Sequence, residues 1–168
     1  MPSNEDQFLE CSEDLTLRLW DIRQRLFKPA VEFKVGTNFA TNCDVLPGKE
    51  GDHYLATGHR GFNNAGAEVK LWDLRAFKDE GCLLFTYDKH KFSPEAVRFL
   101  SSEVVISASK DQSVHLIDVE GSQCDVFTHN ESFAGLAILR ERSGVVVADV
   151  QSSIFSLNVD VEKKHFDF

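Results

Sequence analysis

Short stretches in which apolar and polar side chains alternate recur along the chain. The clearest is Leu15–Arg23, with the sequence LTLRLWDIR, and a second copy at Glu68–Arg75 reads EVKLWDLR. A period of two places successive side chains on opposite faces of a strand, whereas a helix requires a period near 3.6. Both copies contain Trp-Asp at the same place, so we predict two equivalent strands, each followed by the same kind of turn.

Two weaker copies follow the first two. Ser113–Asp118 (SVHLID) has Ile117 where the first copies have Trp, and Ser153–Asn158 (SIFSLN) has Leu157 there. Counted from Trp20, the equivalent positions follow at intervals of 52, 45 and 40 residues. The pattern therefore predicts four related units along the chain.

The histidines give a second landmark for the unit length. His90 and His129 each precede a pair of apolar residues at offsets of 7 and 9. A repeat of roughly 40–45 residues is typical of the four-stranded blade of a β-propeller. Both landmarks therefore favour an all-β repeat architecture.

These motifs resemble the WD40 repeat family. The string Leu9–Asp21, LECSEDLTLRLWD, is similar to the second and third strands of a WD40 repeat with the turn between them. The resemblance covers nearly the whole chain and implies an all-β fold of antiparallel four-stranded blades in an incomplete ring. It implies one partial propeller over residues 1–168, with units at approximately 1–23, 24–75, 76–120 and 121–160.

The resemblance also implies structural roles for a set of polar side chains. WD40 blades are often braced by a hydrogen-bonded His, Asp, Ser or Thr, and Trp, and a buried polar group of this kind needs a partner. In this chain the implied brace residues are Asp14, Trp20, Trp72, His90, Ser107, Asp111 and His129. Because Ile117 and Leu157 replace the Trp in the last two units, we expect the polar brace to be incomplete and apolar packing to hold the blades.

The chain supplies roughly three and a half units, fewer than the four to eight blades with which propellers close. The first unit lacks its inner strand, and no blade follows the last unit, so an apolar face is expected at each end. Three alternatives remain open. The chain is a fragment or a non-functional truncation of a longer propeller, two copies pair into one ring, or a partner supplies further blades.

Two surface features are candidates for partner binding. The first is the connection between the second and third strands of the second unit, which is five residues longer than in the first unit and contains Arg60, Phe62 and Asn63. Insertions in repeats map to loops on one face, often the binding face, and arginines and aromatic residues are enriched in interfaces. The alternative is a tolerated insertion without a partner.

The second feature is the Trp-Asp-x-Arg tail, present at Trp20–Arg23 and at Trp72–Arg75. It resembles the box by which some WD40 proteins dock onto the adaptor of a cullin-type ubiquitin ligase as substrate receptors. The resemblance implies that Arg23 and Arg75 contact that adaptor, on the face opposite the long connection. The alternative is that each arginine is a solvated charge that follows Trp-Asp in this family.

Composition and charge narrow the class of partner. The 27 acidic and 18 basic residues give a net charge of −9, whereas nucleic-acid binding normally needs a basic face. No stretch approaches the roughly 18 consecutive apolar residues of a membrane span, and residues 1–7 are too polar and acidic for a signal peptide. We therefore expect protein partners, no nucleic acid, no membrane, and a cytoplasmic or nuclear location.

No motif in the sequence assembles a catalytic, metal or cofactor site. The four cysteines form no C-x-x-C pair and are expected to be reduced, and the six histidines show no H-E-x-x-H spacing. Neither a Gly-rich phosphate loop nor a G-x-S-x-G elbow is present. We therefore expect a scaffold or adaptor that is not an enzyme and that has no catalytic residues, no metal and no cofactor.

Overall fold

A computed structural model describes residues 6–24, 27–46, 53–61, 66–76, 82–139 and 144–167. These residues form strands almost throughout, and the helical structure found among them is one short 3-10 turn, η2 (Leu74–Ala76). The strands are β1 (Gln7–Cys11), β2 (Thr16–Asp21), β3 (Val31–Lys34), β4 (Phe39–Val45), β5 (Tyr54–Arg60), β6 (Glu68–Asp73), β7 (Leu83–Tyr87), β8 (Pro94–Phe99), β9 (Val104–Ser109), β10 (Ser113–Asp118), β11 (Gln123–Thr128), β12 (Phe133–Leu139), β13 (Gly144–Asp149), β14 (Ile154–Asp160) and β15 (His165–Asp167).

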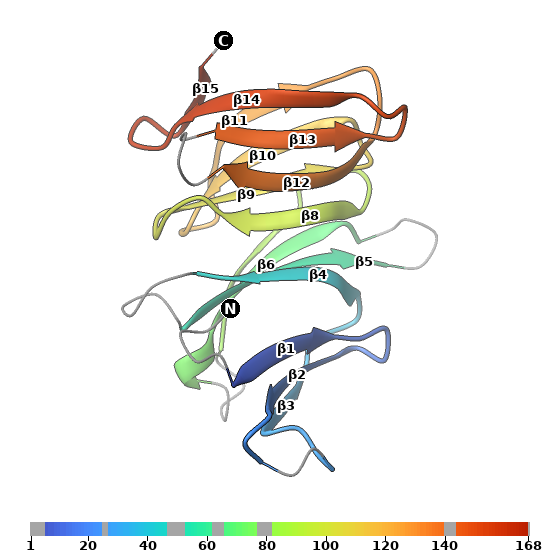
Figure 1. Ribbon diagram of the computed structural model, residues 1–168, viewed down its shortest axis with the longest axis vertical. Coiled ribbons are helices and arrows are strands. Elements are labelled where there is room, and N and C mark those ends of the chain that lie inside the picture. Colours follow the sequence, from blue (N-terminus) through green and yellow to red (C-terminus); the bar gives the residue numbers. More distant parts are fainter. Residues whose placement is uncertain are drawn as a thin grey trace.

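The strands form four antiparallel sheets in which neighbours in the chain are neighbours in space. The orders are β1-β2-β3, β4-β5-β6-β7, β8-β9-β10-β11 and β12-β13-β14-β15. The sheets are stacked along the long axis of the molecule, and β1, β4, β8 and β12 follow one another along the same side (Figure 1). No described strand joins the last sheet to the first. The predicted all-β fold, with antiparallel blades in an incomplete ring, is confirmed.

Each of the first three sheets takes its outermost strand from the next sequence unit. Thus β3, which lies within the predicted unit 24–75, pairs with β2 of the first sheet, and β7 and β11 pair backwards in the same way. The first sheet has only three strands, because no described strand pairs with the inner edge of β1. The fourth sheet has its outer strand in β15, which follows the predicted unit 121–160 and pairs with β14.

The pairing register makes the four predicted copies equivalent. We call β1, β5, β9 and β13 the b strands and β2, β6, β10 and β14 the c strands. In each sheet, the c-strand residue at the Trp position pairs directly with a b-strand residue. These c-strand residues are Trp20, Trp72, Ile117 and Leu157. The stretch of chain that links the two paired residues is five residues longer in the second sheet than in the other three, as the sequence predicts.

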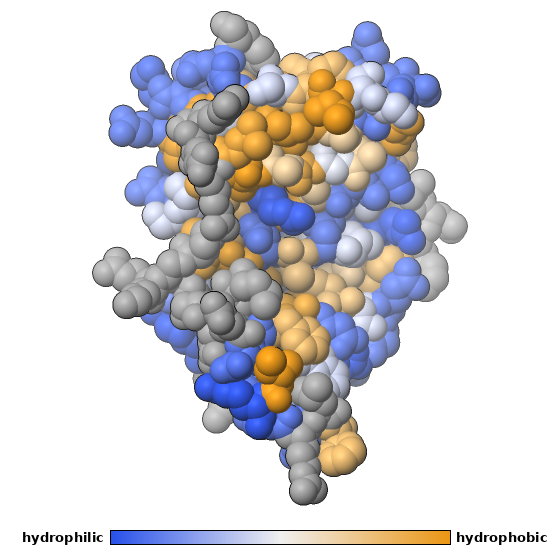
Figure 2. Space-filling model, viewed as in Figure 1, coloured by the Kyte–Doolittle hydropathy of each residue, from blue (hydrophilic) through white to orange (hydrophobic). Residues whose placement is uncertain are grey.

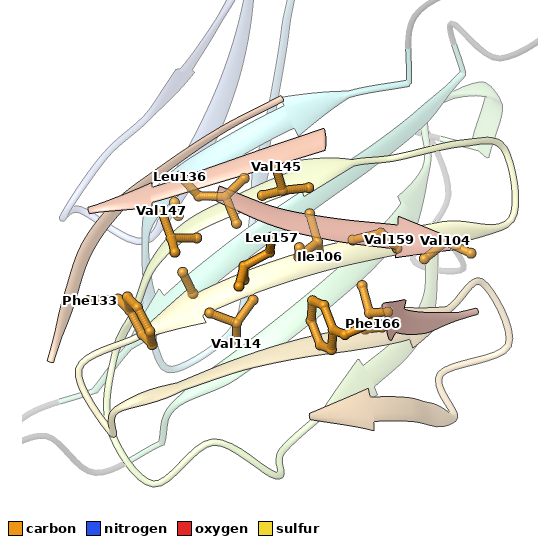
Figure 3. Close-up of a cluster of buried hydrophobic side chains, with 13 residues drawn as sticks. Val104, Ile106, Val114, Phe133, Leu136, Val145, Val147, Leu157, Val159 and Phe166 are labelled. Carbon is orange, nitrogen blue, oxygen red and sulfur yellow. The ribbon is translucent and has the colours of Figure 1, made fainter. Parts of the chain in front are cut away.

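Three apolar clusters fill the spaces between successive sheets. Each cluster contains a c-strand residue of one sheet and the residue at the Trp position of the next sheet. The pairs are Leu17 with Trp72, Val69 with Ile117, and Val114 with Leu157. Figure 3 shows Val114 and Leu157 pointing into the space between the third and fourth sheets. Ile117 and Leu157 therefore fill the place of Trp in the packing, but they lack the N–H donor of its indole ring.

The three short turns between b and c strands share a strained residue. Leu15, Gln112 and Ser152 have φ angles of 67°, 69° and 68°, in the left-handed region. A three-residue hairpin connection commonly requires this conformation at its last residue. Any residue with a side chain bears a cost of about 1–2 kcal/mol there, and glycine does not.

We expect Ser152→Gly to increase the free energy of unfolding by about 0.5–1 kcal/mol, because the relief of left-handed strain exceeds the added freedom of the unfolded chain. Ser152 is exposed, so little packing is lost. Urea denaturation measures the change.

The matched control is Ser156→Gly, an equally exposed serine on the extended strand β14. Glycine there lowers stability by about 0.5–1 kcal/mol. Equal losses from both substitutions would contradict the strain at Ser152.

Candidate functional site

The two Trp-Asp-x-Arg tails fold into the same structure, which we call the Asp-x-Arg turn. In the first, Arg23 Nη2 and Nε donate to the Asp21 carboxylate at 2.6 and 2.9 Å. In the second, Arg75 Nη2 and Nε donate to the Asp73 carboxylate at the same distances. The backbone N–H of each arginine also donates to its aspartate, at 3.0 and 2.9 Å. In each turn, one carboxylate therefore accepts hydrogen bonds from three N–H groups of its arginine.

The two members of each pair differ in their exposure. The side chains of Asp21 and Asp73 are 4% and 15% exposed, whereas those of Arg23 and Arg75 are 56% and 62% exposed. The Arg23 guanidinium holds the pKa of Asp21 below its ordinary value, and Arg75 does the same for Asp73. Both pairs are therefore ionised at neutral pH, with the cation on the outside.

Both turns lie on one rim of the stack, where c strands connect to the outer strands. The equivalent turn of the third sheet has Asp118, which accepts hydrogen bonds from the backbone N–H groups of Glu120 and Ser122. The structure thus brings Arg23 and Arg75 to equivalent places on adjacent sheets, as the sequence predicts.

The end of β5 and the start of β6, which flank the predicted long connection, lie on the opposite rim, because b strands and c strands run antiparallel (Figure 1). Arg60 ends β5, and its guanidinium lies 5.3 Å from the centre of the Phe39 ring. Phe62 and Asn63 lie outside the described residues. Only Arg60 of this candidate surface can therefore be placed.

The structure brings the predicted brace of the third sheet together. His90 Nε2 lies 2.7 Å from Ser107 Oγ, and His90 Nδ1 lies 2.9 Å from Asp111 Oδ2. In place of the missing Trp, the network continues through His115, whose ring stacks on His90 with centroids 4.0 Å apart. Tyr87 bonds the other side of His115. Sequence reasoning missed His115 and Tyr87 because their partners are set by strand register.

The second sheet contains a brace that sequence reasoning also missed. Trp72 Nε1 donates to Thr57 Oγ1 at 2.7 Å, and Thr57 Oγ1 lies 2.6 Å from His59 Nε2. His59 Nδ1 in turn bonds the backbone oxygen of Asn38 at 2.9 Å. Of this brace, only Trp72 was predicted from the sequence, because here the histidine comes from the b strand. Thr57-x-His59, with its spacing of two, is the signal that places both side chains on one face.

In the outer two sheets the predicted brace residues bind other partners. Trp20 Nε1 donates to Glu10 Oε2 at 2.6 Å, and Asp14 accepts the Thr16 backbone N–H at 3.1 Å. His129 Nε2 lies 3.7 Å from Asp149 Oδ2, so the carboxylate comes from the end of β13. The hydrogen-bond partners of the predicted brace residues therefore differ from sheet to sheet.

Burial keeps two of these histidines neutral. It lowers the pKa of His59 to about 4, and burial together with the nearby His90 lowers the pKa of His115 to about 4. Burial alone would raise the pKa of Asp111, but the hydrogen bonds from His90 and Ser113 outweigh it and lower that pKa. The possible ligand atoms of His90, Asp111 and His115 lie within 4.8 Å of one another. Each of these groups also has a protein hydrogen-bond partner, which favours a brace over a metal centre.

A cavity that the sequence did not indicate opens near the inner strands β4, β8 and β12. Its volume is about 570 Å³, within the range of ligand-binding clefts. Leu136, Ile138, Val145 and Phe99 are among its apolar lining residues, and Asp44 and Arg98 are charged members of the lining. Figure 2 shows apolar surface gathered over the fourth sheet on this side. Because three sheets contribute to the cavity, no local pattern could have predicted it.

Comparison with known proteins gives a coarse likeness to a plant protein. The chain is 28% identical over 152 residues to the protein SUPPRESSOR OF PHYA-105 1 of Arabidopsis thaliana, an alignment that covers 82% of this chain. The chain spans about 13% of the length of that relative. No family model matches the chain. Among the described residues, no helix is long and apolar enough to cross a bilayer.

We expect the free energy of unfolding to fall as the pH is lowered from about 6.5 towards 4. An unfolded histidine has a pKa of about 6.5, so in this window the unfolded chain binds protons that folded His59 and His115 do not. Each histidine contributes about 3 kcal/mol to the loss, which is complete only below the folded pKa. Urea denaturation at several pH values above 4.5 measures how steeply the free energy of unfolding changes with pH. This range avoids the lower pH values at which Asp111 also takes up a proton.

His59→Gln and His115→Gln each make that slope shallower, whatever their effect on stability at pH 7. Parallel stability curves for the parent protein and both variants would contradict this assignment.

Proposed function

We propose that this chain is a WD40-type protein-interaction module, a scaffold or adaptor part of an intracellular complex in the cytoplasm or nucleus. Its repeated sheet register and its Trp-Asp-x-Arg tails support membership in the WD40 repeat family. The name of the similar Arabidopsis protein describes a suppressor, which supports a regulatory role over a catalytic one. The polar clusters of the second and third sheets act as structural braces, and the chain is not an enzyme.

The observation that carries the proposal is the pair of equivalent Asp-x-Arg turns on one rim. Each guanidinium is held on one side by its own carboxylate and is more than half exposed on the other. A side chain that is already ordered loses less entropy on binding, and arginine is enriched at interface hot spots. The two turns therefore form a preorganised double contact for acidic or carbonyl groups of a protein partner.

The partner we propose for this rim is the adaptor of a cullin-type ubiquitin ligase, with the chain acting as a substrate receptor. The box resemblance at Trp20–Arg23 and Trp72–Arg75 supports this choice. The net charge of −9 supports a protein partner over nucleic acid.

Replacement of Arg23 and Arg75 together by alanine is expected to weaken adaptor binding by about 10- to 100-fold, the loss typical of one or two hot-spot residues. Calorimetry with the purified adaptor measures the change. Arg23→Lys with Arg75→Lys keeps the charge and removes the bidentate geometry, so it is expected to be intermediate.

The matched control is Arg60→Ala on the opposite rim, which is expected to leave the affinity within about twofold, as for a residue outside the contact. If Arg60→Ala weakens binding and the double variant does not, the long connection with Arg60, Phe62 and Asn63 is the binding surface instead. Adaptor binding that is unchanged in the double variant overturns the Asp-x-Arg proposal.

We further propose that the outward face of the last sheet associates with further blades, either of a second copy or of a partner. Ile154 is 72% exposed there, whereas the equivalent residues Leu17, Val69 and Val114 are at most 1% exposed against the next sheet. Light scattering on a sizing column is expected to show a dimer, and Ile154→Asp is expected to shift it to a monomer. A parent chain that remains monomeric and melts cooperatively contradicts self-association.

A further inference from the structure

Two cysteines face each other between the first and second sheets. Cys43 lies on β4 between Asn42 and Asp44, and both of these neighbours bond β8 of the third sheet. Asn42 Nδ2 donates to the Pro94 oxygen at 2.8 Å, and the Phe99 N–H donates to Asp44 Oδ2 at 2.9 Å. Because side chains alternate along a strand, Cys43 points the other way, towards the first sheet.

Cys11 meets it from the first sheet. Cys11 is the last residue of β1, and both cysteines pack against the apolar cluster that contains Leu17 and Leu55. The two thiols lie close enough that each shifts the pKa of the other. Both side chains are partly exposed, because no described strand covers the inner edge of β1. A small solute can therefore reach the pair.

The surroundings shift the pKa values of the two thiols in opposite directions. The adjacent Cys11 thiol and the positive charge of Arg98 lower the pKa of Cys43 against the opposing effects of burial and Asp44. The adjacent Cys43 sulfur, burial and the negative charge of Glu10 raise the pKa of Cys11. The thiolate is the nucleophilic form of cysteine, so Cys43 is the attacking residue and Cys11 the resolving one.

We propose that Cys11 and Cys43 form a modification site that exchanges with small-molecule disulfides such as oxidised glutathione. The Cys43 thiolate attacks one sulfur of the small disulfide, which breaks the S–S bond and releases one glutathione thiolate. Cys11 then gives up its proton to solvent and attacks the Cys43 sulfur of the mixed disulfide, which releases the second glutathione thiolate. Two protein thiols are oxidised, one small disulfide is reduced to two thiols, and one intramolecular disulfide forms.

The new bond would tie the incomplete first sheet to the rest of the stack. It joins β1 directly to β4, across residues that are 32 positions apart in the chain. Closing a loop of this length restricts the unfolded chain, and we expect the melting temperature to rise by roughly 10 °C. The modification is independent of the proposed adaptor contact, which lies at Arg23 and Arg75.

The test is to incubate the purified chain with oxidised glutathione, block the remaining thiols and digest the protein without reduction. Trypsin releases Cys11 in peptide 1–18 and Cys43 in peptide 35–49. The expected product in mass spectrometry is these two peptides joined with the loss of two hydrogens, together with the rise in melting temperature.

Cys124→Ser is the matched control, since Cys124 is similarly half-buried but lies on β11 with its thiol directed to the Ser122 oxygen. This variant is expected to retain both the joined peptides and the higher melting temperature. Cys43→Ser and Cys11→Ala are each expected to lose both. Stable glutathione adducts on Cys11 or Cys43, or no joined peptide at any glutathione ratio, overturn the proposal.

Discussion

The stack of sheets depends on one apolar contact layer that is repeated three times, in which a residue of one c strand and the residue at the Trp position of the next sheet belong to the same buried cluster. Leu17 shares a cluster with Trp72, Val69 with Ile117, and Val114 with Leu157. The contact is directional, because each sheet offers different faces to its two neighbours. Apolar packing of this kind tolerates changes of residue when volume and position are kept, which explains why Ile and Leu serve where Trp is absent.

Because the apolar packing tolerates such changes, the polar residues around it differ from one sheet to the next. The indole of Trp72 needs a hydrogen-bond partner in the interior and finds it in Thr57, whereas Ile117 has no donor to satisfy. Nevertheless, the third sheet retains an extended polar network around His90 and His115, which are both buried. Such networks favour one arrangement of neighbouring strands, because a partly formed network leaves buried groups without partners.

The periodicity of the chain was sufficient to predict the strands and the repeated units, because alternation and repeat length are local properties. The antiparallel blades and the open ring were implied by the resemblance to WD40 repeats. The paired aspartates and arginines of the Asp-x-Arg turns could also be located, since they are two residues apart. The contacts that depend on register were missed. Glu10 as the partner of Trp20, Asp149 as the partner of His129, and the cysteine pair all join residues whose distance in the chain says nothing of their distance in space.

The backward pairing of the outer strands has a consequence for how the protein is made. Because β3, β7 and β11 complete the sheets that precede their own units, a ribosome must synthesise the beginning of one unit before the previous sheet can close. Until then, the c strand of the unfinished sheet has an open edge, which is a site for incorrect pairing. Each of these sheets can therefore close only after the following connection and outer strand have been synthesised. That outer strand then covers the open edge of the c strand.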